Sequence, residues 1–326
     1  MGTTQRNQTP IGIDIGRVHM RAAQRAADGS WRTACVRRKS TDDVPTSSEV
    51  AYLGEVLWRR GFVGRAIHLK VPDAITREAA AETPPPESGA PVQDIAAAEL
   101  ARFYDLDPTS ITTTLIPLRD RARQGSGFRA HAVAVPKRAL ADLVARFHDL
   151  KRGGLTIDAV AAGPAPMLDL ALRVWPAEPL IVAIEPGDTC LRLTIAESHP
   201  TDGAALLVAR RLDDLGYSAT RDAERPLSPA ALLGRIAEEF NSLMVFLTRL
   251  RPDLGRIPTL VTAGGEQAER IGLALRSRPE LAALMTQLDP ADSSLALDGA
   301  MLSAAAAALG AAHMADAEPA TARGAA

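Results

Sequence analysis

Acidic residues placed just before glycine turns are the feature of this sequence best suited to chemistry. Residues 13–21 and 184–192 each begin with an apolar residue, an acid, a spacer and a glycine, and each ends with an apolar residue and an arginine. A glycine turn lets backbone N–H groups approach a phosphate, and an acid beside it can hold a hydrated divalent cation. The residues at these matching places are Asp14 with Gly16, and Glu185 with Gly187.

A third glycine turn lies late in the chain. Residues 259–262 form a short buried-type run that leads into Gly264 and Gly265, where a helix over 266–276 is predicted to begin. Such a turn lets a base or ribose lie against the backbone near a helix N-terminus. Glycine turns after strands occur in any α/β protein, so the prediction of a nucleotide cleft depends on all three turns occurring in this order.

Strands and helices must bring these turns together. Apolar and β-branched runs predict strands at 11–16 and 180–185, with return strands at 18–23 and 190–196. The longest predicted helix covers 229–250 and carries its apolar residues on one face. Because a strand–turn–strand unit opens each half, we expect an α/β fold of two related lobes, each a mixed β-sheet flanked by helices.

A smaller unit is predicted between these two halves. Residues 67–159 show the order strand, helix, strand, strand, helix, strand, which is typical of a compact α+β subdomain. We therefore expect four parts along the chain. These are the first lobe at 10–66, the inserted subdomain at 67–159, the second lobe with a return to the first at 160–314, and a disordered tail at 315–326.

Composition excludes several classes of protein. The chain carries 37 Lys and Arg against 39 Asp and Glu, so it lacks the basic excess expected of a nucleic-acid binder. Aromatic residues are 4%, too few for a base-stacking platform. No segment is long and apolar enough to predict a membrane span or a signal peptide. These features predict a cytoplasmic protein, although the basic first 70 residues could face an anion or a membrane.

The turns and their order resemble the actin-like ATPase superfamily and, within it, the PilM-like type IV pilus assembly proteins. The resemblance depends on residues 11–16, 156–160, 184–192, 260–265 and 304–311, and covers roughly residues 10–314. It implies ATP and Mg²⁺ between the lobes. By position it assigns the first phosphate motif to Asp14, Gly16, Arg17 and Arg21, the second to Glu185, Gly187 and Thr189, and the adenosine motif to Gly264 and Gly265. Asp14 and Glu185 would hold Mg²⁺ through water.

Three departures from the family pattern weaken that site. Arg17-Val18-His19 follow the first glycine, where the family has small hydroxyl residues. Glu185 is longer than the usual Asp, and Pro186 removes a backbone donor. The stretch between Arg211 and Pro229 lacks the glycine turn and charged helix that help hold adenine. We therefore expect weak or absent ATP hydrolysis and assign no catalytic residue. Whether ATP binds is left open.

The resemblance also implies a role and a partner. The role is that of a scaffold on a type IV pilus or type II secretion-like inner-membrane platform, cytoplasmic and peripheral to the membrane. The partner is the cytoplasmic tail of a single-span, PilN-like membrane protein, and self-association is left open. The alternative function is an active actin-like ATPase or a small-molecule kinase of the same superfamily.

Overall fold

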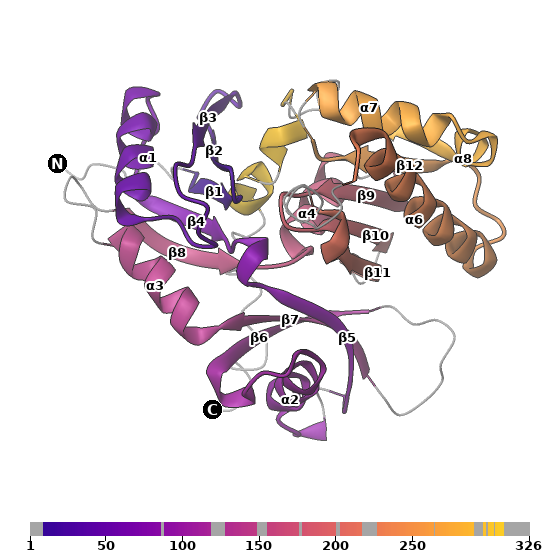
Figure 1. Cartoon of the computed structure of the whole chain (residues 1–326), viewed down its shortest axis with the longest axis horizontal. Helices are drawn as coiled ribbons and strands as arrows, with labels where there is room; N and C mark the ends of the chain where they lie inside the picture. Colours follow the sequence, from indigo (N-terminus) through magenta and orange to yellow (C-terminus); the bar gives the residue numbers. More distant parts are fainter. Residues whose placement is uncertain are drawn as a thin grey trace, which may run out of the picture.

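The computed structural model describes residues 9–85, 88–118, 128–148, 155–175, 178–199, 203–216, 227–263, 265–289, 296–297, 299–302 and 304–309. These residues form two five-stranded sheets and one three-stranded sheet, with helices packed on them (Figure 1). The two larger sheets lie side by side at the top of the view, and the smaller sheet lies below them. The predicted α/β fold of two lobes with duplicated mixed sheets is confirmed.

The first lobe is built on a sheet with the strand order β3-β2-β1-β4-β8. Its outer hairpins are antiparallel, whereas β1, β4 and β8 run parallel. Leu53 and Leu57 of α1, together with Leu143 and Phe147 of α3, are buried against one face of this sheet. The elements are β1 (Ile11–Ile15), β2 (His19–Arg25), β3 (Trp31–Arg37), α1 (Ser47–Arg59), β4 (Ala66–Lys70), α3 (Lys137–His148) and β8 (Thr156–Ala161).

The second lobe repeats this plan, with the strand order β11-β10-β9-β12-β13. The first three strands form antiparallel pairs and the last three run parallel, as in the first lobe. Phe240, Met244 and Ile271 pack helices α6 and α7 on one face. The elements are α4 (Ala165–Val174), β9 (Leu180–Pro186), β10 (Leu191–His199), β11 (Gly203–Leu212), α6 (Pro229–Leu250), β12 (Ile257–Val261), α7 (Gly265–Arg276), α8 (Pro279–Leu284) and β13 (Met285–Leu288).

An apolar cluster joins the two lobes. It contains Leu170 of α4, Ile181 of β9, Ala23 of β2 and residues 304–306 of the last described helical stretch, 304–309. Gly12 of β1 faces this stretch so closely that an added Cβ would collide with the carbonyl oxygen of Ala304. The absence of a side chain at this position therefore lets the final helix pack against the first sheet.

The small subdomain has a sheet with the order β5-β7-β6, covered by α2. Its elements are β5 (Arg77–Thr83), α2 (Val92–Tyr104), β6 (Ile111–Pro117) and β7 (Phe128–Pro136). The strands predicted at the two ends of the insert, β4 and β8, pair with each other, and β4 also pairs with β1 in the first sheet. Parallel pairing joins strands far apart in sequence, which a local pattern does not reveal.

Two elements were not predicted from the sequence. Helix α1 begins at a capping box formed by Thr46 and Glu49. The Ala-rich stretch from Arg77 to Thr83 is strand β5, although alanine does not favour strands. Within the described residues, no helix is both long and apolar enough to cross a membrane.

Candidate functional site

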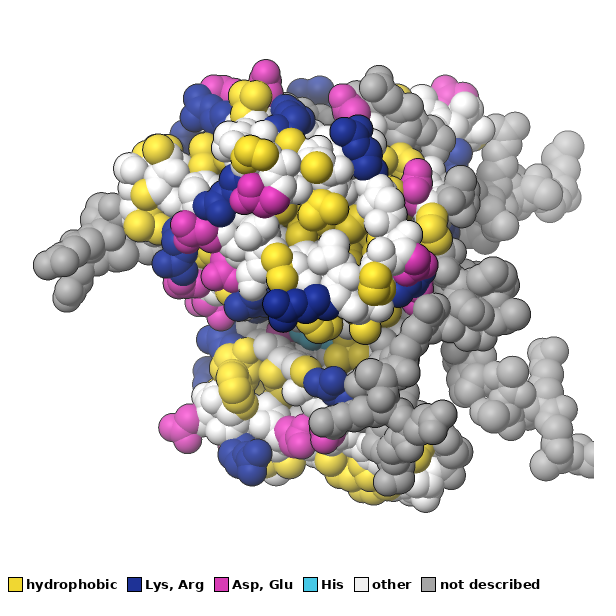
Figure 2. Space-filling view, turned by 90° about the vertical axis from the view of Figure 1, so that its right-hand side faces the viewer, with side chains coloured by type: hydrophobic (Ala, Val, Ile, Leu, Met, Phe, Trp, Pro, Cys, Tyr) yellow, Lys and Arg dark blue, Asp and Glu magenta, His cyan; other side chains and the backbone are white. Residues whose placement is uncertain are grey.

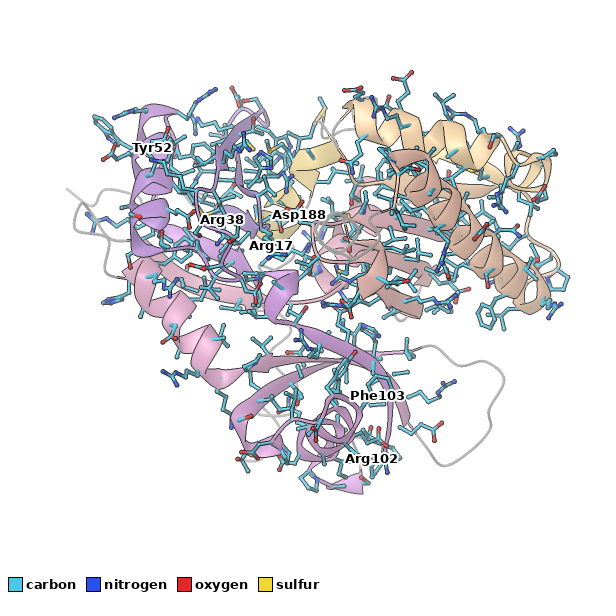
Figure 3. All side chains as sticks on the ribbon, viewed as in Figure 1. Arg17, Arg38, Tyr52, Arg102, Phe103 and Asp188 are labelled. Carbon is cyan, nitrogen blue, oxygen red and sulfur yellow. The ribbon has the colours of Figure 1, made fainter. Side chains whose placement is uncertain are left out.

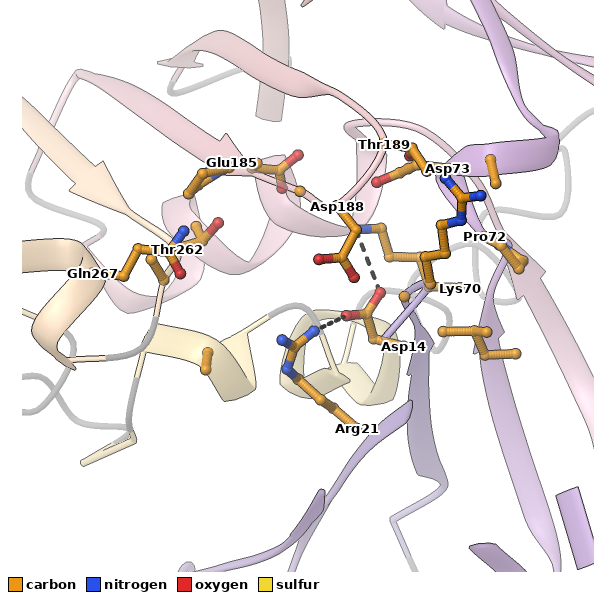
Figure 4. A pocket seen from close by; sticks show the side chains of 18 residues that line it. Asp14, Arg21, Lys70, Pro72, Asp73, Glu185, Asp188, Thr189, Thr262 and Gln267 are labelled. Carbon is orange, nitrogen blue, oxygen red and sulfur yellow. Dashed lines mark ion pairs between the residues drawn. The ribbon is translucent and has the colours of Figure 1, made fainter. Parts of the chain in front are cut away.

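A cavity of about 100 Å³ opens where the two lobes meet (Figure 4). Its walls are the β1–β2 turn, the β9–β10 turn, the segment after β4 and the beginning of α7. Gly265 is the first residue of α7, and Gly264 lies outside the described residues. Thr262, Ala263 and Gln267, which lie near this turn, line the cavity. The predicted site residues that line the cavity are Asp14, Gly16, Arg17, Arg21, Glu185, Gly187 and Thr189.

The two turns have the same local geometry. The N–H of Gly16 donates to the carbonyl of His19 at 2.8 Å, and the N–H of Gly187 donates to that of Cys190 at 2.9 Å. The acid two residues before each glycine lies across the hairpin from an arginine, which pairs Asp14 with Arg21 and Glu185 with Arg192 in the strand register. The repeated pattern in the sequence therefore corresponds to two equivalent hairpins that meet at one cavity.

Asp14 is held by two basic side chains. Its Oδ2 lies 3.5 Å from Nη1 of Arg21, and its Oδ1 lies 3.6 Å from Nζ of Lys70. Burial lowers the pKa of Lys70, but the carboxylates of Asp73, Asp14 and Glu185 outweigh it and raise that pKa above its ordinary value. Lys70 is therefore a permanent cation at the base of the cavity.

Arg192 is the counterpart of Arg21 in the second lobe. It is almost fully buried, with 1% of its side chain exposed. Its Nη1 donates to Glu185 Oε2 at 2.9 Å, and its Nη2 donates to Asp73 Oδ1 at 2.9 Å and also to Glu78. Burial lowers the pKa of Arg192, whereas Asp73, Glu78 and Glu185 raise it well above the ordinary value. The arginine thus neutralises acids from the second lobe, from the small subdomain and from the segment that joins the first lobe to the subdomain.

The first turn is supported from outside the cavity. Arg38 donates from Nη1 to the carbonyl of Gly16 at 3.0 Å and from Nη2 to the carbonyl of Asp42 at 2.6 Å. Glu49 lies 3.6 Å from Arg38 and accepts from the N–H groups of Lys39, Ser40 and Thr46. Although burial raises the pKa of Glu49, these hydrogen bonds lower it to about 2. A buried charge pair therefore fixes the conformation of this turn.

A direct hydrogen bond joins the two turns. The N–H of Val18, in the first turn, donates to Oδ2 of Asp188, in the second, at 3.1 Å. Figure 4 shows the Asp188 side chain pointing into the cavity between the two lobes, and Figure 3 shows Arg17 and Asp188 close together at the junction. A side chain of the second lobe thus contacts the backbone that was predicted to contact phosphate.

Sequence reasoning did not assign a role in the cavity to Lys70, Asp73, Asp188 or Arg192. Arg192 could have been found from the sequence, because it ends the second of the two matching segments as Arg21 ends the first. Asp188 could also have been found, because it follows the second glycine as Arg17 follows the first. Lys70 and Asp73 had no local signal, since parallel pairing of β1 with β4 is what brings them to the cavity.

The side chains around the cavity fit Mg²⁺ and a triphosphate poorly. Asp14, Asp73 and Glu185 each already pair with a cationic side chain of the chain itself. Oε1 of Glu185 is buried without a hydrogen-bond partner among the described residues, and such an atom is commonly satisfied by a water or an ion. A cavity of about 100 Å³ is also small beside the roughly 300–1,000 Å³ of typical small-molecule sites.

A second hollow lies between the second lobe and the small subdomain. Figure 2 shows this face, with the second lobe above, the subdomain below and apolar side chains around the narrow region between them. The residues that line the hollow include His131 of β7, Val208 of β11, and Phe246 and Leu250 of α6. Phe246 and Leu250 are exposed by 49% and 37%. The charged residues Arg129, Glu197 and Arg251 also line this hollow.

Two sheets with one strand order, meeting over a cavity between glycine hairpins, define a two-lobed protein of the actin-like fold. The chain matches the solved structure described as a PilM-PilN type IV pilus biogenesis complex, with a TM-score of 0.62 and 17% identity, over 95% of this chain and 99% of that one. A Bacteroides thetaiotaomicron protein with an actin-like ATPase fold and unknown function matches with a TM-score of 0.49 and 9% identity, over 89% of this chain and 95% of that one. No protein-family model and no curated protein matches this sequence.

Proposed function

We propose that this protein is a cytoplasmic scaffold of a type IV pilus or type II secretion-like assembly platform, peripheral to the inner membrane. The observation that carries the proposal is the match to the PilM-PilN structure, which extends over 95% of this chain and 99% of the other. Coverage of that extent includes the small subdomain as well as the two lobes. The expected partner is the cytoplasmic tail of a single-span, PilN-like membrane protein.

The cavity supports a structural rather than an enzymatic role for the actin-like lobes. Acids that would hold hydrated Mg²⁺ are paired with Arg21, Lys70 and Arg192. Displacing a buried cation from its carboxylate costs more than displacing water, so Mg²⁺ has a disadvantage at this site. We therefore propose that the cleft is degenerate and that hydrolysis is weak or absent.

Deletion of the gene in its host tests the proposed role. We expect fewer surface pili, or less secreted substrate, in the deletion strain, and recovery when the wild-type gene is supplied from a plasmid. Electron microscopy of pili and measurement of the secreted substrate are the readouts. Unchanged piliation and secretion would contradict the proposal.

We propose the end of α1 as the docking surface for the partner tail. Trp58 is 80% exposed and Val63 is 42% exposed, and Arg59 and Arg60 lie beside them on the surface. Exposed aromatic rings and arginines are the residues that most often anchor an interface. The proposed tail would place apolar side chains on the ring and carboxylates on the guanidinium groups.

Charge reversal tests that surface. The double variant Arg59→Glu and Arg60→Glu should weaken binding of a synthetic tail peptide by about tenfold or more, measured by fluorescence anisotropy. The peptide is taken from a single-span protein encoded beside this gene. The matched control is Arg270→Glu with Arg276→Glu on α7, where two exposed arginines are reversed on another face. Equal affinities for both double variants would remove α1 as the docking surface.

An active ATPase or small-molecule kinase is the second candidate. The observation that favours it is that Asp14, Gly16, Glu185 and Gly187 line one cavity and that Glu185 Oε1 has no partner among the described residues. Titration with fluorescent ATP, with and without Mg²⁺, followed by a phosphate-release assay separates the two candidates. Mg²⁺-dependent binding with turnover would establish the enzyme and remove the scaffold-only role.

A further inference from the structure

The hydrogen bond from Val18 N–H to Asp188 Oδ2, 3.1 Å long, joins the two lobes across the cavity. The same carboxylate oxygen lies over Gly16, because a Cβ added to that glycine would be only 3.1 Å from it. A glycine at such a turn leaves room for an anion to approach the backbone. In this protein the anion that occupies the room is a carboxylate of the second lobe.

Three backbone N–H groups of the two turns already donate hydrogen bonds. The N–H groups of Gly16 and Gly187 donate to carbonyls of their own hairpins. Val18 N–H, which points across the cavity, donates to Asp188. A phosphate group that binds Val18 N–H would therefore have to displace Asp188, and the two anions would repel each other while they compete.

The two turns carry opposite charges at equivalent positions. Arg17 follows Gly16, and Asp188 follows Gly187, in segments that fold into equivalent hairpins. Asp188 can therefore meet the first turn as a ligand, because it projects from the matching turn of the facing lobe (Figure 4). The basic residues Arg21 and Lys70 on the other side of the cavity neutralise Asp14 and so remove a charge that would oppose this approach.

We infer that Asp188 is a built-in anionic ligand of the first glycine turn, which excludes phosphate from that turn and holds the two lobes together without a nucleotide. The inference refines the degenerate cleft of the proposed scaffold. The Asp188 contact involves no partner protein, so its test is independent of whether the tail peptide binds.

Amide hydrogen exchange tests the contact itself. In the nucleotide-free wild-type chain, the Val18 amide should exchange slowly by NMR, and Asp188→Ala should speed its exchange by about tenfold or more. Asp142→Asn removes an exposed carboxylate of α3 and should leave Val18 unchanged. Asp188→Asn keeps the shape of the side chain and should give an intermediate rate. Unchanged exchange in both Asp188 variants, or fast exchange in the wild type, would overturn the inference.

Pyrophosphate and Mg²⁺-ATP test the exclusion of phosphate. Neither should raise the melting temperature of the wild-type chain at about 5 mM, and Asp188→Ala should bind pyrophosphate at least about tenfold more tightly by calorimetry. Tight binding of either compound to the wild type, or equal or weaker binding to Asp188→Ala, would overturn the inference. Loss of tail-peptide binding with Val18 still protected would contradict only the proposed partner.

Discussion

Arg192 is a buried cation that contacts three acids. Its guanidinium group touches Glu185 in the second lobe, Glu78 in the small subdomain and Asp73 in the segment that joins the first lobe to the subdomain. Burial alone would raise the pKa of Asp73, but Arg192 and Lys70 outweigh burial and lower it. Asp73 and Glu78 therefore stay ionised, because a buried cation lies beside each of them.

Replacing Arg192 by leucine should therefore be costly. Arg192→Leu removes the cation that Glu185, Asp73 and Glu78 share, which should lower the free energy of unfolding by about 3–5 kcal/mol in urea titration. Arg210→Leu is the matched control, because Arg210 on β11 forms a surface ion pair with Glu239 and its loss should cost only about 0–1 kcal/mol. Similar costs for the two variants would show that the buried cluster is not a stabilising unit.

Strand β1 and the final helical stretch show how closely elements from the two ends of the chain pack. Residues 304–309 lie on the face of β1 that carries Gly12. Nδ1 of His68, on the neighbouring strand β4, lies 3.3 Å from the carbonyl of Ala307. Small side chains on the final helix and a glycine on the strand together allow this approach, and the first turn begins directly after β1.

A side chain at position 12 should separate these elements. Gly12→Val would place carbon atoms against the backbone of residues 304–308, and overpacking of this kind costs about 1–3 kcal/mol or more. Gly234→Ala in α6 is the control, since its Cβ would meet open space and should stabilise the helix by about 0.5–1 kcal/mol. Thermal unfolding measures both, and a neutral Gly12→Val would contradict the close packing.

The small subdomain is joined to the second lobe by charges as well as by apolar contacts. Ile116 and Val133 of the subdomain pack with Ala196 and Leu206 of the second lobe. Beside them, Glu78 contacts Arg192, Arg211 and His131. Burial raises the pKa of Glu78, but Arg192 and His131 outweigh burial and hold it well below its ordinary value.

Acid should therefore loosen the subdomain. Because the folded-state pKa of Glu78 is lowered, its contribution to stability is present above the ordinary value of about 4.5 and is lost as the pH falls below it. Hydrogen exchange in β5, β7, β10 and β11 should speed up as the pH is lowered from about 5 to about 3, after correction for the intrinsic rate. Glu78→Gln should be less stable at pH 7 and show less of this dependence, and an unchanged dependence would contradict the assignment.

Local patterns predicted much of the fold and part of the cavity. The two acid–glycine hairpins and helix α6 follow from periodicity, glycine and proline, which act over a few residues. Helix α1 could have been predicted, because its capping box is visible in the sequence. The pairing of β1 with β4 and of β4 with β8 could not, since it depends on contacts between strands far apart in the chain.

Local sequence specifies two similar hairpins, each with an acid, a glycine and an arginine. The contacts that each charged side chain makes depend on how the lobes pack. Lys70 lies beside Asp14 because strands β1 and β4 pair in parallel. Arg192 forms ion pairs with acids from three parts of the molecule. Asp188 reaches Val18 because the lobes face one another. Charge compensation in a buried site depends on distance in space, and residue order along the chain does not specify that distance.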